Sequence, residues 1–240
     1  MRTVLLLLEG PLQSWGGSSS RTEDRFTGPA PSMSGVLGLV SAALGRTRDE
    51  APLVGFDFAV RVDRPGTTIR DFQTKEKSPL QISFVRNGEE GLLRAGRALG
   101  GGDDPGYTEA AMMTKTYLSG ARFVAALTGE DEVIESIERA LRAPKFHLYL
   151  GRKSCPPGSP VLYGVTDHDN PADALREDWL ERGAGDLVLH STASIGGRYD
   201  YRSADVPVST NPSWRKFASR RVVVTHEKRP APEPLEDALV

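Results

Sequence analysis

TVLLLL, at residues 3–8, predicts a strand buried in the middle of a sheet, because such strands are short and continuously apolar. A helix is predicted next, at roughly 33–45, where apolar residues recur at helical spacing between Pro31-Ser32 and Gly45. Residues 56–62 (FDFAVRV) then alternate in polarity, which predicts a half-buried strand. The chain therefore begins strand, helix, strand.

The same order returns later in the chain. Residues 122–127 (RFVAAL) predict a strand, 130–142 a helix with one apolar face, and 146–150 a second strand. Between the two halves, 67–116 is irregular and glycine-rich, which we interpret as an inserted, extended hairpin. This order predicts an α+β fold of the split βαβ, ferredoxin-like kind, which is also the scaffold of the RRM.

Further strand patterns follow the second half. They are weak at 161–165 and 187–189 and stronger at 221–225 (RVVVT), so we expect a β-rich C-terminal extension. The last residues, 230–240, are rich in Pro and Glu and predict a disordered tail.

Charge is distributed unevenly along the chain. The net charge of −2 argues against a free-standing, non-specific nucleic-acid binder. Locally, however, 143–160 carries +3, 196–222 carries +4 and 167–186 carries −5. This pattern is typical of a subunit with an anionic partner on one side, and scattered solvated charge is the alternative.

The expected compartment is the cytoplasm. No apolar run approaches the roughly 20 residues that cross a bilayer, and the N-terminal apolar stretch is too short for a signal peptide, so no membrane association is expected. A single cysteine, Cys155, excludes an internal disulfide.

The most distinctive motif is YLGRKSCPP at 149–157, where a predicted strand runs into Gly-Arg-Lys-Ser and is stopped by two prolines. Arg152, Lys153 and Ser154 offer hydrogen-bond donors to an RNA phosphate or to a partner's carboxylate. A charged turn made rigid by proline is the alternative interpretation.

A second candidate is the loop at 21–35. Arg25 lies in it, and Ser32 and Ser34 stand at the start of the predicted helix, where free backbone N–H groups suit a phosphate. Simple N-capping by Ser32 explains the same residues. No Lys follows the glycines as in a P-loop, so nucleotide hydrolysis is not supported.

Two further candidates are isolated. Phe72, with Lys75 close by, places an aromatic ring among cations and suits stacking on an unpaired base, although a core phenylalanine is the alternative. Arg220, just before the strand at 221–225, is a candidate for a backbone phosphate or a solvated edge residue.

Patterns for catalysis are few. The four histidines are isolated and lack the His/Cys spacing of zinc sites, so no metal or cofactor is expected. Lys145, His147 and Tyr149 stand at period two around the predicted strand at 146–150 and would face one way, as a proton-transfer set for metal-free RNA cleavage. A metal-independent endoribonuclease is therefore the alternative to RNA binding without catalysis.

Six blocks, in order along the chain, resemble the CasD family, the RAMP-superfamily subunits of the type I-E CRISPR Cascade complex. They are EGPLQSWG (9–16), RFTGPAPSMSGVLGLVSAALG (25–45), RDFQT (70–74), TYLSGARFVAAL (116–127), YLGRKSCPP (149–157) and FASR (217–220). The resemblance implies an RRM-like domain in two parts, 1–71 and 117–228, with an inserted hairpin thumb at 72–116 and a tail at 229–240.

The same resemblance implies a function. The protein would cap the 5′ repeat-derived handle of the CRISPR RNA without cutting it, in a surveillance complex that targets foreign DNA. Its neighbours would be the CasC backbone subunit and the large CasA subunit, so a stand-alone homo-oligomer is not expected.

The handle would lie among the basic loops at 21–35, 149–155 and 215–221, with Phe72 or Trp15 stacked on splayed bases. One position departs from the family pattern: Met33 stands where a Lys or Arg is common, so a phosphate contact by that side chain is absent.

Overall fold

A computed structural model describes residues 1–16, 25–76, 81–86, 89–94, 110–182, 185–194, 196–211 and 213–228. These residues form a strand-rich fold with few helices, so the predicted α+β class is confirmed. The predicted tail at 229–240 lies outside the described residues, as do 21–24 of the first basic loop.

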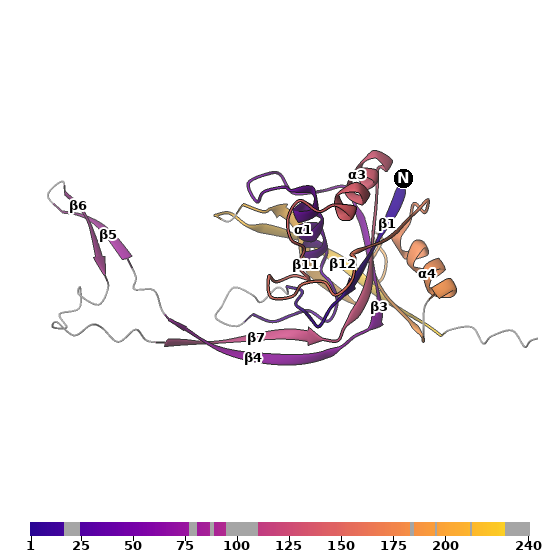
Figure 1. Cartoon of the computed structure of the whole chain (residues 1–240), viewed down its shortest axis with the longest axis horizontal. Helices are drawn as coiled ribbons and strands as arrows, with labels where there is room; N and C mark the ends of the chain where they lie inside the picture. Colours follow the sequence, from indigo (N-terminus) through magenta and orange to yellow (C-terminus); the bar gives the residue numbers. More distant parts are fainter. Residues whose placement is uncertain are drawn as a thin grey trace, which may run out of the picture.

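The main sheet is antiparallel throughout its described pairs, in the order β11-β12-β10-β3-β8-β1-β9 (Figure 1). Its strands are β1 Arg2–Glu9, β3 Asp57–Arg64, β8 Arg122–Gly129, β9 Leu162–Thr166, β10 Leu187–Thr192, β11 Tyr201–Ser209 and β12 Lys216–Glu227.

Four strands and two helices form the centre of the fold, with each helix joining two of the strands. Helix α1 (Met33–Leu44) joins β1 to β3, and α3 (Asp131–Arg142) joins β8 to β9, while β1 lies between β8 and β9 in the sheet. β1 pairs with β8 from Arg2↔Gly129 to Glu9↔Arg122. Because β1 has a neighbour on each side and side chains buried on both faces, its residues are continuously apolar.

Helices α1 and α3 pack over one face of the sheet and enclose the larger hydrophobic core. The predicted ends of α1 are confirmed. The Ser32 hydroxyl accepts a hydrogen bond from the Gly35 N–H at 3.2 Å, and Gly45 ends the helix with a φ of 76°. Ser32 therefore sets where α1 starts and Gly45 sets where it ends. The start of α1 is part of the site described below.

Helix α4 (Pro171–Arg182) covers part of the opposite face, where Leu175 and Trp179 pack with Leu5 of β1. The sequence pattern did not predict this helix, because its apolar residues are few and its surface is acidic. Pro171 occupies its first position, and the Asn170 side-chain oxygen accepts the Ala172 N–H at 2.9 Å.

A long two-stranded arm leaves the body of the molecule (Figure 1). β4 (Thr67–Glu76) pairs with β7 (Ala110–Ser119) in continuous register, and the short strand β2 (Leu12–Gln13) joins the other edge of β7 near the body. Strands β5 (Gln81–Arg86) and β6 (Glu89–Arg94) pair with each other within the segment between β4 and β7.

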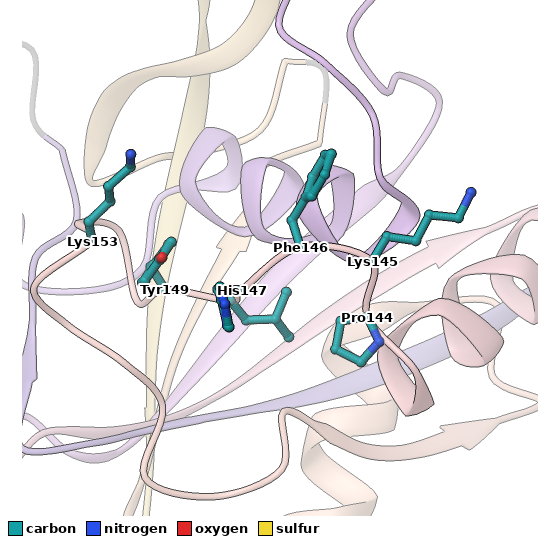
Figure 2. A pocket seen from close by; sticks show the side chains of 7 residues that line it. Pro144, Lys145, Phe146, His147, Tyr149 and Lys153 are labelled. Atoms are coloured by element: carbon teal, nitrogen blue, oxygen red, sulfur yellow. The ribbon is translucent and has the colours of Figure 1, made fainter.

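The predicted strand at 146–150 is wrong. Residues 144–149 form an irregular segment (Figure 2), in which the N–H groups of Lys145 and Phe146 donate to the carbonyls of Ala43 (3.0 Å) and Ala42 (3.2 Å) at the end of α1. β9 takes the position beside β1 that this strand would have held. The segment is held by a helix end and not by a sheet, so its side chains do not alternate.

The C-terminal extension is confirmed as β-rich, since β10 and β12 match the predicted strand patterns. β11 was not predicted, because polar residues and Pro207 interrupt its apolar pattern. It pairs with β12 with two register shifts, and these irregularities accommodate Pro207.

Candidate nucleic-acid interface

The motif loop at 149–157 is docked on the backbone of Ser14. The Ser14 N–H donates to the Leu150 carbonyl at 3.0 Å, and the loop closes on itself through Leu150 N–H to the Cys155 carbonyl at 2.7 Å. Gly151 has a φ of 90°, and a Cβ built there would lie 1.8 Å from the Ser14 carbonyl oxygen. Only glycine allows this approach. Cys155 is buried beneath the loop, and burial raises the pKa of its thiol.

Arg152 joins this loop to two distant segments. Its guanidinium donates to the Arg25 carbonyl at 2.8 Å and to the Thr116 carbonyl at 3.3 Å. The same group lies 4.8 Å from the centre of the Tyr117 ring. Arg152 therefore positions protein backbone with two of its donors, a role that the sequence pattern did not predict.

The backbone around Arg25 runs along the edge of β7. The Arg25 N–H donates to the Thr114 carbonyl at 2.9 Å, and the Thr116 N–H donates to the Arg25 carbonyl at 3.0 Å. Two residues later, the Thr27 N–H donates to the Thr116 hydroxyl at 2.7 Å, and the Thr27 hydroxyl accepts from the Trp15 N–H at 2.8 Å. Arg25 thus has a fixed backbone and an exposed side chain.

The exposed groups near this junction are cationic and polar. Arg25, Lys153 and Ser154 are all exposed. In the described part of the chain, neither Arg25 nor Lys153 forms an ion pair with an acid. Because Arg152 ties their two segments together, Arg25 and Lys153 come from adjacent backbone although they are 128 positions apart in sequence. An anion bound here would meet free donors from both segments.

Phe72 lies on the neighbouring strand of the arm, where it is 65% exposed and pairs across β4 and β7 with Thr114. Since the Thr114 carbonyl also binds the Arg25 N–H, the ring stands one strand away from the Arg25 segment. Phe72 is thus not a core residue. The side chain of Lys75 lies outside the described residues.

The start of α1 is already occupied by acceptors. Ser32 is buried as the N-cap, and the Met33 N–H donates to the Asp205 carboxylate at 2.9 Å. Met33 itself is buried, and Ser34 is half-buried. A phosphate bound directly at this helix end would compete with the Asp205 carboxylate, so the sequence expectation for Ser32 and its free N–H groups needs correction.

Arg220 also differs from the sequence expectation, which treated it as exposed. Only 9% of the residue is exposed, and its guanidinium donates to both oxygens of Asp205 at 2.8 and 3.0 Å. Its central carbon lies 5.0 Å from the centre of the Phe58 ring. Arg220 therefore neutralises the carboxylate that caps α1, and its buried donors do not face a phosphate.

Trp15 is fully buried, so the expectation that it stacks on a base is wrong. Its Nε1–H donates to the Gln13 side-chain oxygen at 3.0 Å, and the Gln13 amide in turn donates to the carbonyls of Leu8 and Ala121, both at 2.9 Å. A Cβ on Gly35 of α1 would approach the Trp15 ring to 2.9 Å. The motif EGPLQSWG is thus an internal support for the site.

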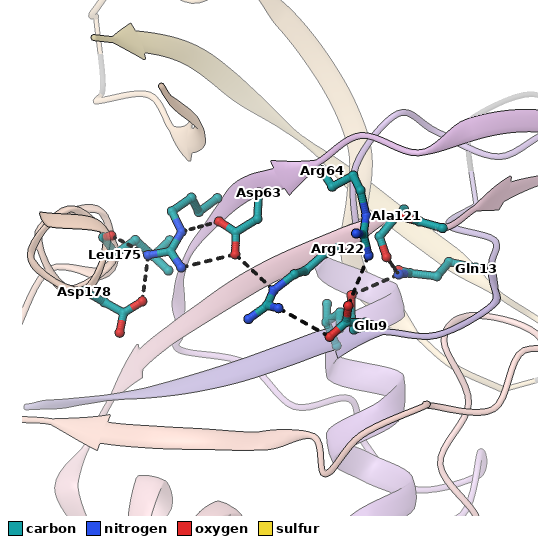
Figure 3. Close-up of polar contacts among 11 residues, drawn as sticks. Glu9, Gln13, Asp63, Arg64, Ala121, Arg122, Leu175 and Asp178 are labelled. Carbon is teal, nitrogen blue, oxygen red and sulfur yellow. Dashed lines mark hydrogen bonds and ion pairs between the residues drawn. The ribbon is translucent and has the colours of Figure 1, made fainter. Parts of the chain in front are cut away.

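Glu9, at the start of that motif, belongs to a charged network across the sheet (Figure 3). Arg122 bridges Glu9 (3.6 Å) and Asp63 (3.5 Å), and the buried Arg61 bridges Asp63 (2.6 Å) and Asp178 of α4 (2.7 Å). Burial alone would lower the pKa of Arg61, but its bonds to Asp63 and Asp178 outweigh it and raise the pKa. The network fixes the sheet end from which the motif loops emerge.

Lys145, His147 and Tyr149 do not form the one-sided set that a strand would give. They line a shallow pocket together with neighbouring residues, but their side chains point in different directions, with the Lys145 ammonium directed away from the His147 ring (Figure 2). The Lys145 stem instead packs over Gly45 at the end of α1. Proton transfer between the three is not prearranged.

The described residues hold neither a metal-binding cluster nor a membrane-spanning helix. No group of three or more His, Cys, Asp or Glu side chains is placed there to hold a metal ion. Within the same residues, every helix is too short or too polar to span a membrane.

Comparisons with known proteins agree with the motif blocks. A family model described as CRISPR-associated protein (Cas5) matches residues 3–223. The CRISPR system Cascade subunit CasD of Escherichia coli (strain K12) is 32% identical over 238 residues, covering 92% of this chain and 94% of that protein.

Solved structures match as well. A chain of a CRISPR RNA-guided surveillance complex superposes with a TM-score of 0.70 and 29% identity, over 95% of this chain and 91% of that one. A crystal structure of a Cas protein superposes with a TM-score of 0.65 and 31% identity, over 97% of this chain and 100% of that one. The resemblance inferred from the six blocks is confirmed.

Proposed function

The chain belongs to the Cas5 family of CRISPR-associated proteins, and we propose that it is the non-catalytic RNA-binding subunit of a Cascade-type surveillance complex. In this role it holds the 5′ repeat-derived handle of the CRISPR RNA and links the CasC backbone to the large CasA subunit. Two relatives support a place in such a complex, since one is a Cascade subunit and the other a chain of an RNA-guided surveillance complex.

The proposal includes a ferredoxin-like, RRM-like core. Strands β9-β1-β8-β3, with α1 and α3 as their connections, follow the order of a split βαβ unit. The β4–β7 arm is the thumb in this scheme, and we assign it to contact a neighbouring subunit.

One observation carries the RNA-binding role: Arg152 fastens the motif loop to the Arg25 backbone and to β7, so that the exposed cations Arg25 and Lys153 come from backbone segments that are tied together. Cations on a fixed backbone suit phosphate, because the two segments need no rearrangement on binding. Phe72, exposed one strand away, then offers a platform for an unstacked base.

Arg220 and Ser32 have a supporting part in this proposal. Arg220 holds the Asp205 carboxylate, which accepts the Met33 N–H and ties the start of α1 to β11, while Ser32 caps the helix by accepting the Gly35 N–H. Together they keep the loop before α1 in place beside the motif loop. Ser154 and Ser34 complete the polar lining.

The test uses the full chain, a short RNA of the handle sequence recovered from the purified complex, and a scrambled RNA. In Arg25→Ala/Lys153→Ala we expect handle affinity at 0.1 M salt to fall about 25-fold and the salt slope to fall by about 1.4, since each phosphate contact to a single strand contributes about 0.7. Arg142→Ala, an exposed arginine of α3, is the matched control and should change neither quantity.

An unchanged slope in the double variant would contradict the assignment of these two cations. Equal affinity of the wild-type chain for handle and scrambled RNA would contradict recognition of the handle and leave only general phosphate binding.

A further inference from the structure

Strand β12 exposes a row of side chains that the proposed handle site does not use. Side chains alternate along a strand, and Arg220 and Val222 are buried toward the core, so Phe217 and Arg221 face the other way. Arg215, just before the strand, lies over the Phe217 ring and extends the row. The row spans about 20 Å from Arg215 to Arg221, at about 3.4 Å per residue. It lies on the face of the sheet that α4 covers in part.

The position of α4 confirms which face this is. Glu227 is in the same alternating series of β12 as Arg221, and its carboxylate accepts from Arg176 of α4 at 2.7 Å. α1 instead meets β11 through Asp205, which binds the oppositely directed Arg220. The row and the start of α1 are therefore on opposite faces of the β11–β12 hairpin.

Each arginine of the row lies over an aromatic ring. The Arg215 guanidinium is 5.0 Å from the centre of the Phe217 ring, and the guanidinium groups of Arg221 and Arg202 lie 5.7 and 5.6 Å from that of Tyr199. A guanidinium stacked on a ring keeps its N–H edges available, so its donors are oriented without being consumed. We call these five residues the β12 strip.

Like charges in the strip are close together and lack acids. Arg202 and Arg221 are directly opposite in the antiparallel pair, an arrangement that is unfavourable for like charges. In the described residues no carboxylate forms an ion pair with Arg202, Arg215 or Arg221. The nearby carboxylate of Asp200 accepts a backbone N–H from Val224 at 2.8 Å.

A similar crowding of charge occurs at the tip of the hairpin. Burial and the neighbouring Arg48 lower the pKa of Arg215. The tip is held against the loop that carries Arg48, because the Thr210 hydroxyl donates to the Arg48 carbonyl at 3.0 Å. Beside Arg215, Trp214 is 66% exposed and Lys216 is exposed. An anion bound along the strip would relieve repulsion at both ends.

We propose that the β12 strip, extended by Trp214 at the hairpin tip, is a second binding surface for single-stranded nucleic acid, separate from the handle site. Ring-supported cations along an extended strand, with the exposed Trp214 ring at one end, match the requirements of a flexible polyanion with stackable bases. A protein partner fits less well, because it would have to present several carboxylates in a row, whereas a nucleic acid carries an anionic phosphate at every nucleotide.

The test uses the complex purified with its own CRISPR RNA, so that the handle site is filled, and a fluorescent 20-nucleotide oligo-dT or oligo-U as the probe. In Arg202→Ala/Arg215→Ala/Arg221→Ala we expect probe affinity at 0.1 M salt to fall about a hundredfold and the salt slope to fall by about 2, from about 0.7 for each lost contact. Trp214→Ala should lower affinity about tenfold through lost stacking.

Arg215→Glu, a single change at an exposed position, guards against misfolding of the triple variant and should lower probe affinity about 25-fold. Arg142→Ala is again the control. The amount of CRISPR RNA in each complex reports on the handle site separately and should stay unchanged.

Wild-type probe affinity in a triple variant that assembles normally would overturn the proposal. So would loss of another protein subunit with probe binding intact, which would identify the strip as an interface for an acidic protein surface.

Discussion

Arg220 gives the sharpest test of the division between supporting and RNA-contacting residues. We predict that Arg220→Met destabilises the chain strongly while leaving the salt dependence of handle binding unchanged. The substitution keeps an apolar stem at this position, but it removes the guanidinium, which lies over the Phe58 ring and makes both hydrogen bonds to Asp205.

The magnitude follows from burial. Arg220 is 9% exposed and Asp205 3%, so the variant leaves a buried carboxylate with the Met33 N–H as its remaining donor. Removing one partner of a buried ion pair costs about 3–5 kcal/mol. For a chain of this size, that corresponds to a loss of about 6–20 °C in the unfolding midpoint.

Urea unfolding of the full chain measures the free energy of unfolding. A salt titration of handle-RNA binding measures the salt slope, at a temperature below the unfolding midpoints of both the wild type and the variant. Adding Asp205→Asn to Arg220→Met should restore part of the lost stability, because the uncompensated charge is then gone. A loss below about 1 kcal/mol, or a salt slope reduced by about 0.7, would refute the supporting role and return Arg220 to the RNA contacts.

Two further predictions concern the motif loop and the pH dependence of stability. Gly151→Ala should abolish handle binding, because the new Cβ would meet the Ser14 carbonyl. Gly55→Ala is the control, since Gly55 has a similar φ of 82° but open space around it, and this variant should bind the handle normally. Equal handle affinities of the two variants would contradict the clash. Burial, with Arg220, lowers the pKa of His190 from its usual 6.5, so the native state favours the neutral ring. The free energy of unfolding should therefore fall as the pH drops below about 6.5, where His190 of the unfolded chain takes up a proton. Urea titrations at several pH values should show a smaller fall in His190→Gln than in the wild type. Identical falls in the two proteins would exclude His190 as the cause.

Local patterns were sufficient wherever one element's own residues carry the information. The run at 3–8 implied a central strand because both its faces are buried, and Ser32 and Gly45 bounded α1 because caps act within one turn. The six blocks carried the family, which the comparisons confirmed.

Patterns failed where a distant segment decides the outcome. Residues 144–149 look like a strand, yet the backbone carbonyls at the end of α1 hold them, and β9 takes the edge of the sheet. Trp15 looked like an exposed loop aromatic, but the cavity formed by Gly35 and Gln13 buries it.

The residues alone were therefore enough for the fold class, for the core elements up to α3 and for the family, because hydrophobic periodicity and caps are local properties. Which cations are free was decided only by tertiary structure. In the sequence, Arg220, Arg152 and Lys153 are three basic residues with nothing to separate their roles. In the structure, Arg220 is buried against Asp205, Arg152 holds backbone carbonyls and Lys153 is exposed. Pairing and burial depend on residues far away in the chain, and these set whether a charge can meet a phosphate.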